Sequence, residues 1–342
     1  MVCWSLLNGS IELSIVISKV IKMMVIFNAQ KAFCAIDITP ELKQRFEFVI
    51  SKFAEQVLLG DNDSKLESIT ITDHFVDDVL AFQREHLNGV EGVTHNEYGR
   101  AFGKMIYVPN QKKYHVFLDS EYGSFLIDDA IMDVVISRMN GDRALINNIV
   151  TQRKCAMNLL AHELEHYKFA NTQVAPGANG SFDNYCERVM FELFDEYNAS
   201  RKAIEVSPVS AFTYDVEYVL KIEKYIIDQR LKYNKRKVSL NQFVSLFHQY
   251  TRQALMYIAA NLGSKHGIKD DMSVFEECCC FPLVKDLEQA FGKLFSLMQQ
   301  GKRITVSRNH VEWLKEYYEL FGVYISETTE GWYYDIPFDE FL

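Results

Sequence analysis

A stretch near the middle of the chain has the residue types and spacing of a metal site. Residues 158–167 read NLLAHELEHY, so His162 and His166 stand four positions apart and Glu163 directly follows the first histidine. On a helix, such histidines lie about 5–6 Å apart on one face and can reach the same ion. A neighbouring carboxylate can accept the proton of a water that zinc acidifies. This stretch therefore predicts a zinc-dependent hydrolase with Glu163 as general base.

The same stretch also fits a second motif, which has the same two histidines but a different general base. We call the two possibilities the forward frame (HExxH) and the inverted frame (HxxEH). The run His162-x-x-Glu165-His166 also fits the inverted pattern, in which Glu165 would take the proton. We favour the forward frame, which is the commoner one, because an acidic helix downstream suits it better. Glu165 is then expected to matter much less than Glu163.

The elements around this stretch are those needed to hold such a site. Residues 142–171 have a helical pattern with an apolar flank over 155–161, which predicts a buried helix. A glycine-containing loop over 174–181 ends it, and a second amphipathic helix is predicted over 182–205. That second helix can return past the first and offer a carboxylate as a third ligand.

Three acidic residues of the second helix are candidates for this ligand. Glu192 and Glu196 share a face at a spacing of four, whereas Asp195 is rotated by about 100° from Glu196. Helix lengths in a tight hairpin favour Glu192, but a loop of this length lets the second helix slide by a turn. Spacing alone therefore does not decide whether Glu192 or Glu196 is the third ligand.

The chain resembles the gluzincin-like metallopeptidases, in particular the ImmA/IrrE-type group, over roughly residues 65–205. The resemblance rests on the strand-like runs ITI (69–71) and VFL (116–118), on HELEH, and on EYNASR (196–201). This last run looks like the Glu-x-x-Ala segment in which several such families place their third zinc ligand. Glu165 and Lys168 depart from the long zincin signature, in which an uncharged and an apolar residue are usual at these positions.

The resemblance implies a site and an activity. His162, His166 and Glu196 would bind Zn²⁺ and Glu163 would be the general base. With Glu196 chosen as the ligand, we expect Glu192 to hydrogen-bond a ligand histidine. The implied activity is hydrolysis of a protein or peptide substrate. We expect an extended substrate to pair with residues 114–118, taken as an edge strand, through main-chain hydrogen bonds.

Further segments complete an expected α+β fold. Helices are predicted over 40–58 and 74–88, and strands over 68–72, 105–108 and 114–118. After Pro208 the composition changes to long helices, predicted over 210–233, 239–262, 283–300 and 307–321, with a closing hairpin within residues 323–334. We expect three parts: an N-terminal extension (1–25), a zincin-like metallopeptidase domain (26–206) and a mainly helical C-terminal domain (207–342).

Composition limits the classes of function. The 342 residues carry a formal net charge of −10, which gives no strong signal for nucleic-acid binding. Seven cysteines, three of them consecutive at 278–280, do not form a regular disulfide framework and favour a reducing cytoplasm. The apolar stretch 5–27 is interrupted by charges, so no membrane role is expected. Three explanations of this stretch are considered, in order of preference. It is a packed extension, or it is not translated because translation starts at Met23 or Met24, or it is a membrane segment.

Other interpretations are weaker. Residues 99–105 suggest a phosphate loop but have the wrong spacing. The cysteine triplet lacks metal-site spacing and is expected to pack at a helix end, with a redox or ligand role as the weaker alternative. The basic run 230–237 is expected to be a solvated connection, with a polyanion contact as the weaker alternative. The alternatives to a peptidase are a metal-binding regulator without turnover and a toxin-like or mobile-element factor whose C-terminal helices bind a nucleic acid or a partner protein. The oligomeric state is left open by the sequence.

Overall fold

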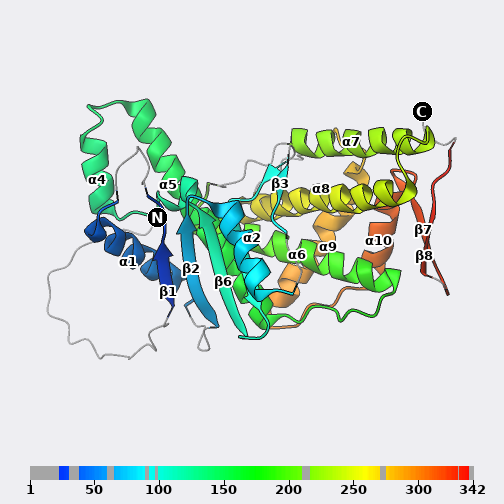
Figure 1. Ribbon diagram of the computed structural model, residues 1–342, viewed down its shortest axis with the longest axis horizontal. Coiled ribbons are helices and arrows are strands. Elements are labelled where there is room, and N and C mark those ends of the chain that lie inside the picture. The colour runs from blue at the N-terminus through cyan, green and yellow to red at the C-terminus, as the bar shows by residue number, and fades with distance from the viewer. Residues whose placement is uncertain are drawn as a thin grey trace.

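The protein has an α+β fold, with its main sheet in the first half of the chain and long helices in the second (Figure 1). The computed structural model describes residues 23–30, 38–59, 65–88, 92–96, 99–209, 216–269, 275–329 and 331–338. The elements in chain order are β1 (Met24–Phe27), α1 (Pro40–Val57), β2 (Leu66–Thr72), α2 (Phe75–His86), β3 (His95–Asn96), β4 (Gly99–Arg100), β5 (Gly103–Val108), β6 (Lys113–Asp119), α3 (Ser120–Gly123), α4 (Asp129–Ser137), α5 (Arg143–Thr172), α6 (Phe182–Val206), α7 (Val216–Asn234), α8 (Leu240–Ile268), α9 (Phe281–Gln299), α10 (Arg308–Glu319), β7 (Tyr324–Thr328) and β8 (Gly331–Asp335).

The main sheet has four strands in the order β1-β2-β6-β5. Both β1 and β6 run parallel to β2, and β5 pairs antiparallel with β6. Parallel neighbours need a crossover connection, which α1 provides between β1 and β2. The short turn between β5 and β6 places Lys112 in the left-handed region, with φ 54°. This order makes β5 an edge strand.

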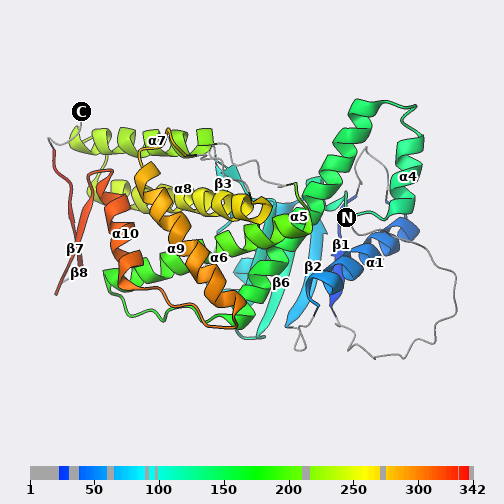
Figure 2. The same cartoon turned by 180° about the vertical axis from the view of Figure 1, so that it is seen from behind.

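Helices cover both faces of this sheet. Alternate side chains of a strand point to opposite faces, and β6 shows the pattern clearly. Val116 and Leu118 belong to the core that α1 and α5 share with the sheet, whereas Phe117 packs with Phe75 and Val79 of α2. Figure 1 shows α2 in front of the sheet, and Figure 2 shows α5 crossing the opposite face. The histidine-bearing helix is thus anchored on the sheet.

Local capping signals set where the long helices begin. The Thr39 side chain accepts a hydrogen bond from the Leu42 amide, and Pro40 occupies the first turn of α1. Asp142 caps α5 and Ser181 caps α6 through equivalent bonds to backbone amides. A side-chain oxygen before a helix satisfies an amide that has no partner within the helix. These helices therefore begin close to the residues that the sequence predicted.

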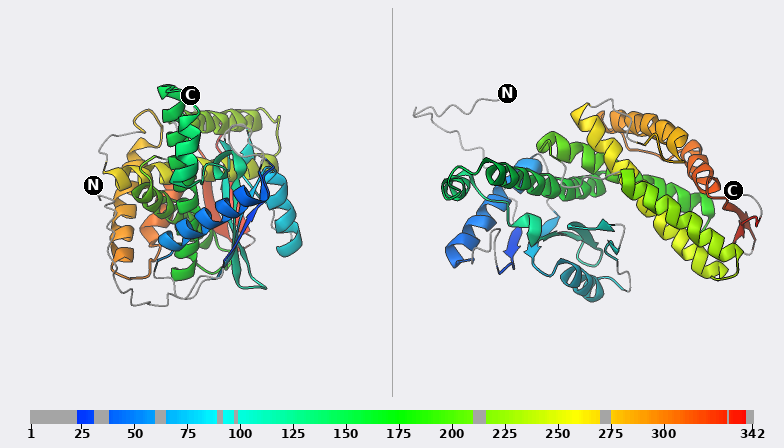
Figure 3. Two further views of the ribbon diagram at one scale, coloured as in Figure 1. Left: turned by 90° about the vertical axis from the view of Figure 1, so that its left-hand side faces the viewer. Right: turned by 90° about the horizontal axis from the view of Figure 1, so that it is seen from above.

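The second core lies among the helices of the C-terminal half. It joins side chains of α6, α7, α8, α9 and α10 and extends to Val323 and Ile336 beside the closing hairpin. Because α6 also packs on α5, it connects this helical core to the sheet. Viewed from above, the helical half extends away from the sheet, with β7 and β8 at its far end (Figure 3). The hairpin predicted near the C-terminus is confirmed.

Several expectations are corrected by the sheet topology. The strand predicted over 114–118 is not an edge strand, because β6 lies between β2 and β5. The predicted extension 1–25 ends inside β1, where Met24 and Val25 pair with Ser68 and Ile69. Residues 1–22 lie outside the described residues. The small strands β3 and β4 and the short helices α3 and α4 were not predicted.

The phosphate-loop reading concerns a segment that the structure describes. A phosphate loop at residues 99–105 would need a helix directly after it, and the chain instead forms the strands β4 and β5 there. Among the described residues, none of the helices has the length and apolar character that a bilayer crossing requires.

Candidate metal centre

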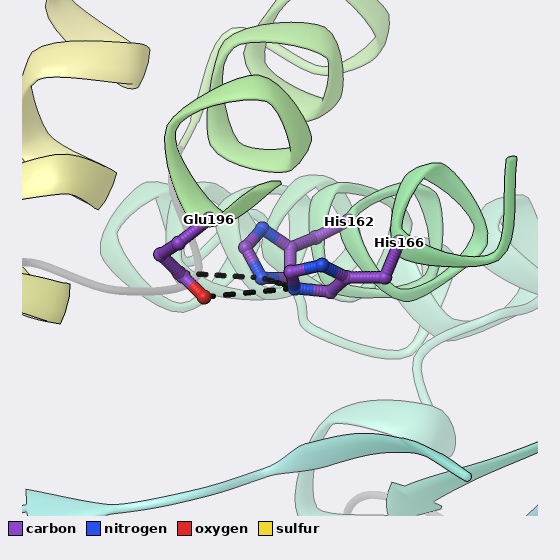
Figure 4. Close-up of side chains that lie close together, drawn as sticks. All are labelled: His162, His166 and Glu196. Carbon is purple, nitrogen blue, oxygen red and sulfur yellow. Dashed lines mark hydrogen bonds and ion pairs between the residues drawn. The ribbon is translucent and has the colours of Figure 1, made fainter. Parts of the chain in front are cut away.

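The two histidines of α5 face the same point beside α6. His162 and His166 stand one turn apart, and their side chains are 5% and 14% exposed. Their rings are nearly perpendicular, at 88°, and the two Nε2 atoms are 3.0 Å apart (Figure 4). Both imidazoles thus direct the same nitrogen to one place, as a shared metal ion would require.

Glu196 of α6 is the third residue at this place. Its Oε1 lies 3.5 Å from Nε2 of His162, and its Oε2 lies 3.6 Å from Nε2 of His166. Zinc with ligands at about 2.0–2.1 Å in tetrahedral geometry holds them roughly 3.3 Å apart. The three separations are close to that value. Two imidazoles and one carboxylate are also a donor set that zinc accepts in sites with an open fourth position.

Residues of α6 hold the outer nitrogens of both rings. Nδ1 of His166 lies 3.0 Å from Oδ2 of Asp195, and Nδ1 of His162 lies 3.5 Å from the Ser200 hydroxyl. A hydrogen bond at Nδ1 fixes the ring and leaves Nε2 as the free lone pair. The helix that provides Glu196 therefore also orients the two histidines.

Glu192 does not take part in this arrangement. Its carboxylate forms an ion pair with Arg252 of α8 at 2.7 Å, and both side chains are well exposed. The expectation that Glu192 hydrogen-bonds a ligand histidine is therefore wrong, and Asp195 has that position instead. The reason is the crossing of α5 and α6, which places His166 level with Asp195 and Glu196, one turn beyond Glu192.

The helix α8 approaches α6 closely just beyond Glu196. A Cβ atom on Gly263 would lie 2.2 Å from the carbonyl oxygen of Tyr197, and one on Gly267 would lie 2.8 Å from that of Arg201. Two glycines one turn apart thus allow the helix backbones to touch directly. This contact begins at the residue after Glu196 and holds α6 against α8. Along α5, α6 is held by other contacts, such as those of Phe169 with Phe191 and Phe194.

Glu163 points from α5 toward the edge strand β5. A Cβ atom on Gly103 would lie 2.5 Å from Oε1 of Glu163, so only glycine lets the strand come this close. Burial raises the pKa of Glu163 to about 7, while His166, Lys104 and a hydrogen bond from the Met105 amide act in the opposite direction. The carboxylate is therefore held between the histidines and the strand backbone.

Glu165 lies in a different environment. Its carboxylate is buried and pairs with Nζ of Lys168 at 2.6 Å. The same ammonium group is 3.5 Å from the backbone oxygen of Val57 at the end of α1. Glu165 is thus engaged with Lys168 away from the histidine cluster, which supports the forward frame.

Charges in the cluster perturb one another strongly. Burial lowers the pKa of His162 to about 4. Burial also opposes the charged form of His166, but Asp195 and Glu196 outweigh it and raise the pKa of His166 well above its ordinary value. Burial would raise the pKa of Glu196, and the two histidines instead hold it below its usual range. The cluster has more acidic than basic groups, which favours a cation.

The structure brings the predicted residues His162, Glu163, His166 and Glu196 together. Sequence reasoning missed Asp195 as a histidine partner, although it stands next to Glu196. It also missed Ser200 and the glycine-marked approach of β5, because both depend on contacts between distant segments. No family model, curated protein or solved structure matches the chain.

Proposed function

We propose that this protein is a zinc-dependent metallopeptidase. The observation that carries the proposal is the convergence of His162, His166 and Glu196 beside a carboxylate, Glu163, that faces an edge strand. The distances and the donor set fit zinc with three protein ligands. Bound zinc would supply Lewis-acid polarisation of the scissile carbonyl and acidification of a water.

The chain's own residues then have separate tasks. His162, His166 and Glu196 hold the ion, while Asp195 and Ser200 keep the rings in the orientation that presents Nε2. The carboxylate of Glu163 accepts a proton from the attacking water and passes it to the leaving amine. No residue of the chain needs to form a covalent bond with the substrate in this scheme.

The free edge of β5 is where we propose that a peptide substrate pairs. The Asp119 amide bonds the Phe102 oxygen at 2.8 Å, and alternation from there directs the backbone groups of Gly103, Met105 and Tyr107 away from β6. The Met105 amide already donates to Glu163, so a peptide would pair with the remaining groups of this edge. Within the described residues, no other strand pairs with that side. An extended peptide can add a strand there through main-chain hydrogen bonds, and β5 passes beside Glu163.

The proposal is tested with the full chain loaded with zinc and incubated with a library of extended peptides, with cleavage read by mass spectrometry. We expect cleavage by the wild type and none by Glu163→Gln at equal zinc content. Cleavage by both proteins would indicate a contaminating peptidase. A zinc-bound wild type that cleaves no peptide would refute the proposal and favour a regulator without turnover.

A further inference from the structure

A second group of metal-binding side chains lies in the helical half, far from the histidines in sequence. Glu223 of α7, Cys278 and Cys280 place one carboxylate oxygen and two sulfur atoms within 4.8 Å of one another. All three side chains are buried, with residue exposures of 4%, 5% and 0%. The two cysteines belong to the turn that precedes α9.

The backbone of this turn presents the two thiols together. The Cys278 amide bonds the Phe275 oxygen, and the Phe281 amide bonds the Cys278 oxygen, at 3.0 and 3.1 Å. Successive tight turns bring Cys278 and Cys280 to the interior, whereas Cys279 between them is exposed. The Cys-x-Cys spacing therefore becomes a pair of converging sulfur ligands.

Polar atoms at the cluster have unmet bonding capacity. Oε2 of Glu223 accepts a hydrogen bond from the Cys279 amide at 3.3 Å, but Oε1 is buried and has no hydrogen-bond partner. The Tyr317 hydroxyl is also buried without a partner. Burial raises its pKa well above the ordinary value, with smaller contributions from the neighbouring Cys280 and Glu223. Buried polar groups of this kind cost free energy unless something satisfies them.

The Cys279 and Cys280 side chains hydrogen-bond the Glu223 carboxyl group. Among the described residues, no lysine, arginine or histidine forms an ion pair with this carboxylate. A buried carboxylate beside two thiols is costly when isolated, whereas a divalent cation would pair with it directly. Two thiolates and one carboxylate suit zinc, which accepts sulfur and oxygen ligands at about 2.0–2.3 Å.

We propose that Cys278, Cys280 and Glu223 bind a second zinc ion, separate from the histidine cluster. Binding releases the two thiol protons to solvent and leaves thiolates on the ion. The ion ties α7 to the start of α9 and so closes a long loop in the helical half. This site shares no residue with the histidine cluster and does not depend on the proposed peptidase activity.

Cobalt substitution of the full chain tests the site, because thiolate ligands give Co²⁺ an intense near-ultraviolet charge-transfer band that histidine and carboxylate ligands do not give. We expect this band in the wild type and in His162→Ala/His166→Ala. We expect the band to be absent from cobalt-substituted Cys278→Ser/Cys280→Ser. Elemental analysis of the same variant loaded with zinc should show about one equivalent of zinc less than the wild type. Cys186→Ser is the matched control, since Cys186 is a buried free thiol of α6 outside the cluster.

Absence of the band in the folded wild type would overturn the proposal. A band and zinc content unchanged in folded Cys278→Ser/Cys280→Ser would do the same. If the double serine variant does not fold, Glu223→Gln decides, because it keeps the side-chain shape and both thiols. We expect Glu223→Gln to weaken zinc binding at the thiolate site by at least tenfold, and an affinity equal to that of the wild type would exclude Glu223 as a ligand.

Discussion

The hydrogen bond between Asp195 and His166 gives the sharpest test of how α6 builds the metal centre. In Asp195→Ala, Nδ1 of His166 loses the carboxylate at 3.0 Å that fixes its ring and raises its basicity. Removing such a partner of a ligand histidine typically costs 10–100-fold in metal affinity. We therefore expect the zinc dissociation constant to rise by about 10–100-fold, equivalent to roughly 1.4–2.7 kcal/mol.

Glu192→Ala is the matched control, because it truncates a carboxylate one turn away on the same helix. Its partner Arg252 is half exposed, so the pair contributes only about 0–1 kcal/mol to stability. Zinc affinity should stay within about twofold of the wild type.

The assay is competition for zinc between the purified protein and a chromophoric chelator of known affinity. Circular dichroism at equal zinc saturation checks that both variants keep their helices. Asp195→Ala with the affinity of the wild type would refute the role given to Asp195. A larger loss in Glu192→Ala than in Asp195→Ala would show that α6 lies a turn away from the position described.

Three further predictions address the base, the strand and the helix contact. Glu163→Gln should keep its zinc but lose roughly 10²–10⁴-fold in peptide turnover, while Glu165→Gln loses much less; the reverse order would establish the inverted frame. Gly103→Ala should lower turnover at unchanged zinc content, because its methyl group would lie 2.5 Å from the Glu163 carboxylate; unchanged turnover would show that the strand can move away. Gly263→Ala should lower the free energy of unfolding by about 1–3 kcal/mol in denaturant titrations. In Gly292→Ala the added methyl group would have no atom within 4 Å, so the free energy of unfolding should rise by roughly 0.5–1 kcal/mol. Equal changes in the two variants would contradict the close contact between α6 and α8.

Features with a local cause were predictable from the sequence. Thr39, Asp142 and Ser181 each cap the helix that follows, and the turn after Val108 joins two antiparallel strands that are neighbours in the chain. The HELEH spacing likewise determines, within a single helix, that His162 and His166 share a face. In each case the residues that interact are only a few positions apart.

The sheet order depended instead on pairings between distant residues. Residues 114–118 have the composition of an edge strand as well as of a central one, and only the pairing of Leu66–Thr72 with β6 distinguishes the two. The strand β1 was missed because its four residues form the end of the apolar stretch 5–27 and pair in parallel with β2, across a helix. Parallel pairing has no turn signal in the local sequence. The substrate strand was therefore assigned to β6 when the free edge belongs to β5.

The choice between Glu192 and Glu196 as the proposed third ligand could not be made from the sequence. On an isolated helix Glu192 and Glu196 are equivalent, since both lie on one face and the loop before α6 can accommodate either position. The equivalence is broken by the packing of α6 on α5, in which Phe169 contacts Phe191 and Phe194 and the Ser207 hydroxyl bonds the Lys154 oxygen at 2.8 Å. With α6 in that register, Glu196 faces the histidines and Glu192 reaches Arg252 of α8. The choice between the two glutamates as the proposed ligand thus depends on contacts between α5 and α6, and no pattern within α6 alone could have supplied it.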